Sequence, residues 1–196
     1  MKRKKLLLTL LGVLLALPAL ARDFTYTYEG QTLTYTVIDE EAKTCKTKDG
    51  VEYTSSFSSG NYVSGTLIIP SVAKDGDVEY TVTALGKVAF GGELTSVTIP
   101  ESVTTIGKYA FRNCDKLTSA EFASIEALCG IDFANLYSNP LYVAHHLYIA
   151  GKEVTEVVIP NTVSKIGDYT FSGCSSLTSV TIPESVTTIG YDAFRG

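Results

Sequence analysis

One fourteen-residue segment occurs twice in this sequence without a change. LTSVTIPESVTTIG occupies residues 94–107 and again residues 177–190, and the related segment VTEVVIPNTVSKIG occupies residues 154–167. The distance from Leu94 to Leu117 is 23 residues, and the last two copies also start 23 residues apart. A fixed period of this length is typical of a solenoid, in which each repeat is one turn that buries its apolar face only against its neighbours.

The repeats also define the domain organisation. The period predicts five rungs within residues 63–196, the last of them incomplete, with strands beginning near Leu67, Leu94, Leu117, Val154 and Leu177. The third rung is irregular and carries an insertion at 123–153, and extra residues around 74–77 predict a surface loop. Residues 24–28 and 33–37 alternate aromatic or apolar residues with Thr on both sides of a short turn, so we assign residues 22–62 to an N-terminal β-hairpin cap that covers the first rung.

Each rung begins with the alternation expected of a β-strand. In LTSVTIP the apolar Leu94, Val97 and Ile99 point inward, while Ser96 and Thr98 stay outside. The interior is completed from the returning side of the rung by Val103, Ile106, Ala110 and Phe111. The recurring glycines are interpreted as backbone positions that tolerate no side chain, and they stand at Gly107, Gly167 and Gly190.

The full motif resembles a known repeat. IP-x-S/T-V-x-x-IG-x-x-AF-x-x-C, over about residues 63–196, resembles the BspA-like leucine-rich repeat, also called the Treponema pallidum type. The irregular segment around Asn139 and Pro140 resembles an insertion common in that family. The resemblance implies a right-handed, mostly β leucine-rich-repeat solenoid with one short strand per rung. It also implies a surface or secreted protein of host-associated anaerobic bacteria, some of which adhere to host extracellular proteins or to other cells.

The first 21 residues predict a secretory signal peptide. Basic residues at 2–5 precede an apolar run at 6–17, and Ala19 and Ala21 supply an A-x-A cleavage site. The twelve-residue run is too short to span the ~30 Å of a bilayer core as a helix. Cleavage after Ala21 therefore predicts a secreted or cell-surface chain with no membrane insertion afterwards. An anchor that is never cut is the alternative interpretation.

The charge balance excludes two kinds of partner. Losing the four basic residues of the leader leaves 12 Lys and Arg against 21 Asp and Glu, a net charge of −9. No basic block remains to neutralise phosphates, so we expect neither nucleic acid nor anionic membrane as a partner.

The four cysteines are expected to pack rather than to react. Cys114 and Cys174 hold the same place in two rungs that a third rung separates, which puts them beyond the ~7 Å between Cα atoms that a disulfide allows. We interpret both as buried thiols. A bridge from Cys129 to Cys114 or to Cys45 stays open at this point.

No residue pattern predicts catalysis, a metal site or a cofactor. His145 and His146 are adjacent, and adjacent residues of a strand point to opposite faces, so they are poorly placed to share a metal ion. The short motifs of metalloproteases, nucleotide-binding loops and serine hydrolases are absent, and the sequence around Cys129 is not that of a catalytic cysteine. We therefore predict that the protein is not an enzyme and binds no cofactor.

The remaining prediction concerns a binding surface. Strand alternation leaves one row of residues outside in each rung: Thr66, Ile68, Ser96, Thr98, Ser119, Glu121, Glu156, Val158, Ser179 and Thr181. A competing site is the irregular segment, because it carries aromatic side chains beside the strands, at Tyr137, Tyr142 and Tyr148. Either surface predicts adhesion to an extracellular or cell-surface protein or glycan. The alternatives are a spacer within a larger surface protein and a carbohydrate site on the tyrosines of the cap.

Overall fold

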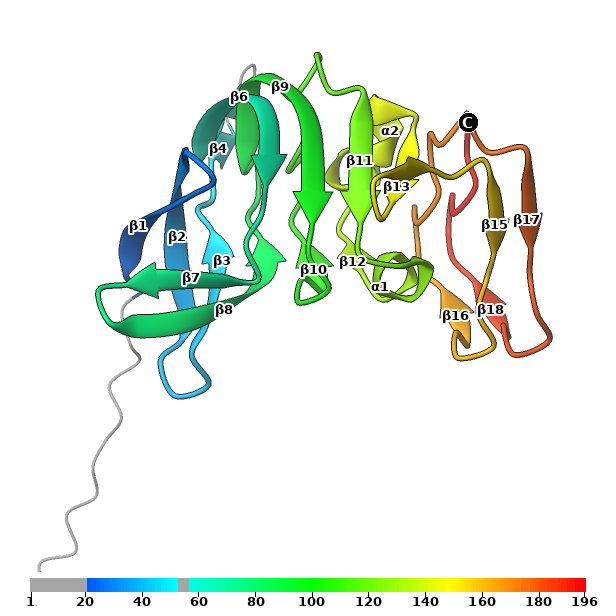
Figure 1. The fold of residues 1–196 in the computed structure, drawn as a ribbon, viewed down its shortest axis with the longest axis horizontal. Coiled ribbons are helices and arrows are strands. Elements are labelled where there is room, and N and C mark those ends of the chain that lie inside the picture. The colour runs from blue at the N-terminus through cyan, green and yellow to red at the C-terminus, as the bar shows by residue number, and fades with distance from the viewer. Residues whose placement is uncertain (1–20, 53–56) are drawn as a thin grey trace, which may run out of the picture.

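A computed structural model describes residues 21–52 and 57–196, so the expected leader lies outside the described residues apart from Ala21. The chain forms a mostly β solenoid of about five turns, which advances from left to right in Figure 1. Its front sheet contains β6 (Asn61–Ile68), β9 (Phe90–Ile99), β11 (Ser119–Phe122) and β13 (Leu147–Ile149), and continues with the separate pair β15 (Glu156–Val158) and β17 (Ser179–Thr181). The repeat solenoid predicted from the period is confirmed.

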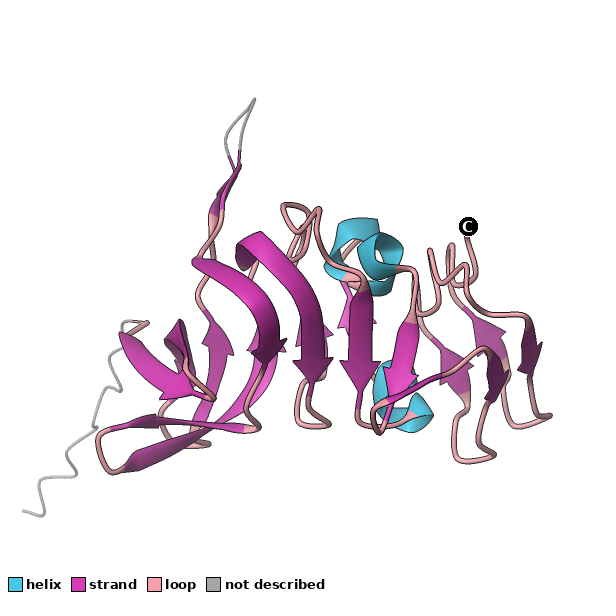
Figure 2. Cartoon of the chain, turned by 45° about the horizontal axis from the view of Figure 1, so that its top comes forward, coloured by secondary structure: helices cyan, strands magenta, loops and turns pink. Residues whose placement is uncertain are grey.

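A second sheet forms the returning side of the turns. Along the solenoid it contains β8 (Val78–Leu85), β10 (Thr105–Ile106) and β12 (Asp132–Phe133), followed by the pair β16 (Lys165–Ile166) and β18 (Thr188–Ile189). Strands of successive turns pair in parallel in both sheets, as expected when each turn repeats the path of the one before. Figure 2 shows the two sheets on opposite sides of the core.

The first turn is covered by a small antiparallel unit. β1 (Asp23–Tyr28) and β2 (Gln31–Asp39) form the predicted hairpin through Glu29 and Gly30, which both have positive φ, as a tight two-residue hairpin turn requires. β3 (Thr44–Thr47) pairs with β2 on one side and in parallel with β8 on the other. The cap therefore extends the second sheet, on the returning side of the turns. β4 (Val51–Glu52) and β5 (Phe57–Ser58) form a second, short hairpin.

The extra residues of the first turn are ordered by pairing. The sequence predicted a surface loop around residues 74–77, but β7 (Val72–Asp75) runs antiparallel to β8, with the turn at Gly76. The prediction of an unpaired loop is therefore wrong, because the residues on both sides of Gly76 form backbone hydrogen bonds with each other.

The irregular segment contributes strands to both sheets of the solenoid. It contains α1 (Ile125–Cys129), β12, the 3-10 helix η1 (Leu136–Ser138), α2 (Leu141–Ala144), β13 and β14 (Lys152–Glu153). β13 pairs in parallel with β11, so the front sheet has a strand that the 23-residue period did not predict. His145 is the left-handed residue that ends α2, and β13 begins at Leu147. The assignment of His145 and His146 to a strand is therefore wrong.

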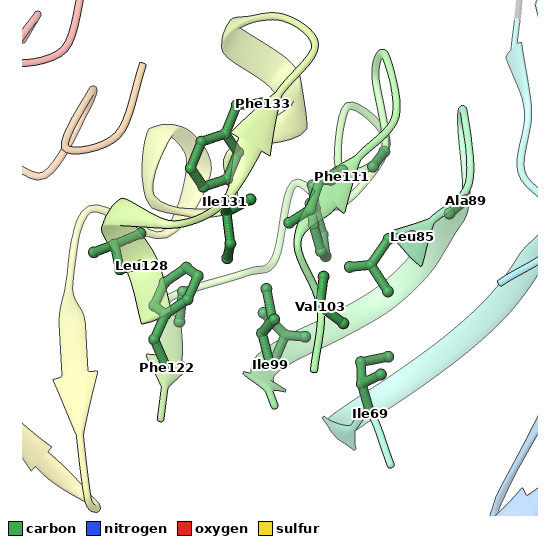
Figure 3. Packing of buried hydrophobic residues seen from close by; sticks show 14 of the residues in the cluster. Ile69, Leu85, Ala89, Ile99, Val103, Phe111, Phe122, Leu128, Ile131 and Phe133 are labelled. Carbon is green, nitrogen blue, oxygen red and sulfur yellow. The ribbon is translucent and has the colours of Figure 1, made fainter. Parts of the chain in front are cut away.

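The core lies between the two sheets. Val97, Ile99 and Phe111 are each at most 1% exposed, as the alternation predicted, and Figure 3 shows their neighbours pointing into the same interior. Phe90 and Phe111, from two successive turns, stack with ring centres 5.2 Å apart. In the last turn Val180 is half-buried and Ile182 is 41% exposed.

Both sheets are interrupted at the same place. Among the described residues, no backbone pairing joins β12 to β16 or β13 to β15 as ladder neighbours. The Asn139 side chain, fully buried, bridges the interruption instead. Its Nδ2 donates to the backbone oxygens of Tyr169 and Thr170 at 2.6 and 2.9 Å, and its Oδ1 accepts from the backbone N–H of Leu141 at 2.9 Å.

The recurring glycines are required by close approach of successive turns rather than by a positive φ. A Cβ on Gly107 would lie 2.7 Å from the backbone nitrogen of Lys87, and one on Gly190 would lie 2.5 Å from that of Asp168. A Cβ on Gly167 would meet nothing nearer than 3.4 Å, because the turn before it is the irregular one. The prediction that no side chain is tolerated is therefore confirmed at two of the three positions.

This difference gives a matched pair of variants. We expect Gly107→Ala to lower the free energy of unfolding by about 2 kcal/mol, because backbone atoms of the previous turn must move. Gly167→Ala should change it by less than about 0.5 kcal/mol, since the added methyl makes ordinary contacts. Urea titrations of both variants measure the difference, and equal losses would show that the glycines do not act through contact between turns.

Candidate functional site

The outward side chains of the front sheet stand in two rows. Strand register places Thr66, Ser96 and Ser119 side by side in one row. It places Ile68, Thr98, Glu121 and Tyr148 side by side in the other. On the second pair of strands the rows continue as Glu156 beside Ser179 and Val158 beside Thr181. We call the surface formed by these eleven residues the ladder face.

The structure brings together the ten ladder residues predicted from the sequence, but it exposes them unequally. Ser96, Thr98, Ser119 and Glu121 are half-buried beneath their neighbours. Four residues of the last two strands are exposed: Glu156, Val158, Ser179 and Thr181. Val158, the last residue of the short strand β15, is 68% exposed, which is unusual for a β-branched apolar side chain. The part of the ladder face on β15 and β17 is therefore the most open to a partner.

Glu121 already has partners within the protein. Its Oε1 accepts from the backbone N–H of Gly151 at 2.7 Å, and its Oε2 accepts from the Thr98 hydroxyl at 3.4 Å. Gly151 lies in the turn between β13 and β14, so this carboxylate fixes the hairpin of the irregular segment against the front sheet. Glu121 thus has a structural contact that the sequence did not predict.

Tyr148 is the ladder residue that strand counting missed. It lies on β13 directly beside Glu121 and opposite Glu153 of β14. The sequence marked it only as an aromatic residue of the irregular segment. The alternation of Leu147, Tyr148 and Ile149 is a strand signal, but three residues outside the repeat register were too few to place the strand. The ladder face therefore carries an aromatic side chain after all.

The other two tyrosines of the irregular segment lie elsewhere. Tyr137 and Tyr142 are half-buried and pack edge to face, with ring centres 5.2 Å apart. Tyr137 also contacts Tyr109, which follows β10 on the returning side of its turn, at 6.2 Å. Tyr137 and Tyr142 therefore pack against each other, whereas Tyr148 lies on the ladder face.

The cysteines have the properties of packing residues. All four are free and buried. Burial raises the pKa of Cys45 and of Cys114 to about 12, and that of Cys129 to about 11, so each thiol stays protonated near neutral pH. The buried-thiol interpretation of Cys114 and Cys174 is confirmed, and the structure contains neither of the bridges from Cys129 that the sequence left open.

The histidines have different surroundings, and each has one polar partner. His145 Nδ1 lies 2.8 Å from the backbone oxygen of Gly173, and His146 Nδ1 lies 2.7 Å from Oε1 of Glu153. Within residues 21–52 and 57–196, no three His, Cys, Asp or Glu side chains are grouped as a metal site would need. In the same ranges, no helix is long and apolar enough to cross a membrane.

A solenoid whose turns each add one strand to an open front sheet is the architecture of a leucine-rich repeat protein. The sequence comparison gives the family. The model of the BspA type leucine rich repeat region matches residues 74–138 and 145–196 in six copies, so the chain belongs to that family. Proteins of this family are typically cell-surface or secreted, and their repeats are generally a non-enzymatic scaffold.

Solved structures with a similar fold come from several bacteria. A leucine rich cell surface protein from Faecalibacterium prausnitzii is 23% identical over 88% of this chain and 46% of its own, with a TM-score of 0.46. A leucine-rich repeat protein from Bacteroides ovatus is 24% identical over 85% of this chain and 44% of its own, with a TM-score of 0.43. The T. pallidum leucine rich repeat protein is 17% identical over 81% and 83% of the two chains, with a TM-score of 0.34.

These similarities are too low to transfer a function. The chain spans less than half the length of the first two proteins. No curated protein gives a significant match.

Proposed function

We propose that this protein is secreted or displayed at the bacterial surface and binds an extracellular or cell-surface macromolecule of a host, a protein or a glycan, through its ladder face. The observation that carries the proposal is the register of the front sheet. It sets Ile68, Thr98, Glu121 and Tyr148 in one continuous row, and Val158 is 68% exposed on the following pair of strands. An ordered surface with exposed apolar side chains and a half-buried tyrosine is suited to a large partner.

The composition of the face favours weak individual contacts. Ser96, Ser119 and Ser179 offer hydroxyls, whereas Tyr148 is the one aromatic residue among the eleven, and none is Arg or Trp. Tight interfaces usually rely on several Trp, Tyr and Arg anchors. The proposed binding therefore depends on many copies at one surface, which add avidity to a weak single contact. The proposal assigns the protein no catalytic role and no cofactor.

A binding array tests the function itself. The purified protein is applied to immobilised extracellular-matrix proteins and glycans, and we expect saturable binding to at least one of them. A complete lack of saturable binding would favour the spacer alternative over adhesion.

Ladder variants then test the surface. We expect Tyr148→Ala combined with Glu156→Lys to weaken the binding found by the array about tenfold, because the change removes the aromatic contact and reverses a charge. Tyr191→Ala is the matched control, since Tyr191 is 67% exposed and follows β18 on the returning side. Thermal melts confirm equal folding. If the ladder variant binds as well as the parent protein, the partner does not use this face.

A further inference from the structure

A groove lies where the returning sheet is interrupted between the irregular turn and the turn that follows it. One part, of about 290 Å³, lies between the end of α1, at Cys129 and Gly130, and residues 162–165 of the next turn. An adjoining part of about 390 Å³ shares Cys129, Gly130 and Lys165 with the first and reaches Asp132 of β12. Figure 1 shows α1 between β12 and β16, beside this space. We call the two parts together the interruption groove.

The regular turns show which hydrogen bonds belong at this position. In the second turn, the backbone N–H of Thr104 donates to the oxygen of Thr83 at 2.9 Å. The N–H of Gly107 donates to the oxygen of Leu85, also at 2.9 Å. The last turn makes the same two bonds, from Thr187 to Ser164 and from Gly190 to Ile166. Each regular returning segment is therefore joined to the turn before it by two N–H groups.

At the interruption these two N–H groups have no partner. Ser164 and Gly167 stand 23 residues before Thr187 and Gly190, so they occupy the equivalent positions. Within residues 21–52 and 57–196, no oxygen accepts a hydrogen bond from the backbone N–H of Ser164 or of Gly167. The edge of β16 that faces the groove therefore has two backbone donors to offer.

A hydroxyl group at the same edge is also unused. In the last turn, Ser185 Oγ donates to the backbone oxygen of Val163 at 2.9 Å. Thr162 is the equivalent residue one turn earlier, it is exposed, and it lines the groove. In the described part of the chain its hydroxyl has no hydrogen-bond partner. A ligand at this edge would therefore have to present oxygen atoms.

The opposite wall of the groove presents acceptors and negative charge. Glu126 of α1 and Asp132 of β12 line it, and the backbone oxygen of Ile131 lies 3.6 Å from the position of a Cβ on Gly167. Two carboxylates against the single ammonium group of Lys165 disfavour a free anion. An extended polypeptide suits both walls, because its backbone presents carbonyl oxygens and N–H groups along both edges.

We propose that the interruption groove binds an extended segment of a partner polypeptide, of strand-forming sequence and neutral or positive charge, which adds as a strand beside β16. Its carbonyl oxygens accept from the N–H groups of Ser164 and Gly167, and its own N–H groups donate to Glu126 and to the oxygen of Ile131. The returning sheet and the ladder face lie on opposite sides of the core (Figure 2), so this site does not depend on the proposed function of the ladder face.

The probe is a synthetic peptide with the sequence of residues 103–109, VTTIGKY, acetylated and amidated at its ends. In the protein, the oxygens of Thr104 and Ile106 in this segment accept from N–H groups of the next turn at 2.8 and 3.1 Å. The peptide therefore has a backbone that pairs at such an edge, and its lysine gives it the positive charge that suits the groove.

Titration of this peptide into isotope-labelled protein is followed by two-dimensional NMR. We expect saturable shifts of the amide signals of Ser164 and Gly167. The last turn also has an open strand edge at Thr188 and Ile189, so these amides are the internal control. No shift at Ser164 and Gly167, or shifts confined to Thr188 and Ile189, would overturn the assignment.

Two further ligands separate backbone pairing from other kinds of binding. The same peptide with N-methyl groups at Thr104 and Gly107 lacks the two donors that face the previous turn in the protein, and it should bind at least tenfold more weakly. Equal binding of the methylated peptide would show that strand pairing is not responsible. Inorganic phosphate is the second ligand, and the same shifts at equal or lower concentrations of phosphate would identify an anion site instead.

Variants locate the groove. A Cβ on Gly130 would meet only the oxygens of Glu126 and Ala127, at 3.4 Å, so Gly130→Leu is expected to fold and to weaken peptide binding at least tenfold by filling the groove. Thr162→Val should leave the melting temperature unchanged and weaken the peptide about fivefold, because its hydroxyl has no partner in the described part of the chain.

Thr187→Val is the matched control for Thr162→Val. The Thr187 hydroxyl donates to the backbone oxygen of Ser164 at 3.2 Å, on the side of β16 away from the groove, so this variant should bind the peptide like the parent protein. Parent-like binding by both groove variants, or an equal loss with Thr187→Val, would show that the peptide does not bind in the interruption groove.

Discussion

Replacing Asn139 with alanine is expected to lower the free energy of unfolding by about 4 kcal/mol. The change removes three hydrogen bonds made by a fully buried side chain, and it leaves the backbone oxygens of Tyr169 and Thr170 without these donors. Each buried polar group that loses its partner costs about 1–3 kcal/mol. Because Asn139 bridges the point where both sheets are interrupted, the variant should also unfold in two steps, with the turns after the interruption melting first.

Urea titration followed by circular dichroism measures both effects. The matched control is Asn113→Ala, since Asn113 is half-buried and its amide donates one bond, to Ser59 Oγ at 3.2 Å. We expect that variant to lose about 1 kcal/mol and to keep a single transition. A similar small loss for Asn139→Ala would mean that apolar contacts alone join the two parts of the solenoid.

Replacing Phe111 with alanine is expected to have an effect of similar size, about 4 kcal/mol, because it leaves a cavity beside Phe90 in the core between the sheets. Phe194→Ala makes the same substitution at a phenylalanine that is stacked but more exposed to solvent. It stacks on Phe171 at 5.3 Å but is 38% exposed, so Phe194→Ala should cost only about 1 kcal/mol.

Thermal melts compare the two phenylalanine variants with a variant in which His145 and His146 are both alanine. Both histidines are exposed, and we expect a loss below about 1 kcal/mol from the pair. Equal losses at Phe111 and at the two histidines would show that the buried, repeated aromatic positions are not the main source of stability.

The sequence was sufficient to predict the strand and the inward face of each regular turn. The alternation in residues 94–99 gives the strand and its inward face, and the 23-residue period gives the positions of the turns. Both are local properties, since a strand turns alternate side chains to opposite faces whatever lies beside it. The ten predicted strand residues of the ladder face were found from this rule alone.

Burial, in contrast, depends on the neighbouring turns. Ile99 and Ile182 occupy the same position in identical segments, yet Ile99 is 1% exposed and Ile182 is 41% exposed. Gly107 and Gly167 share a motif, but only at Gly107 would an added Cβ clash with the backbone of the turn before it. Identical residues differ because each turn of a solenoid is completed by contacts with the next.

Only the tertiary structure decided the arrangement of the irregular segment. It has no counterpart in the repeat, so no register could place Tyr148 on the front sheet or Tyr137 against Arg112 on the other side. The hydrogen bonds of Asn139 join residues about thirty positions apart, which alternation within a strand cannot predict. The repeated positions could be predicted because their environment is repeated with them, whereas the residues that break the period depend on contacts that occur once.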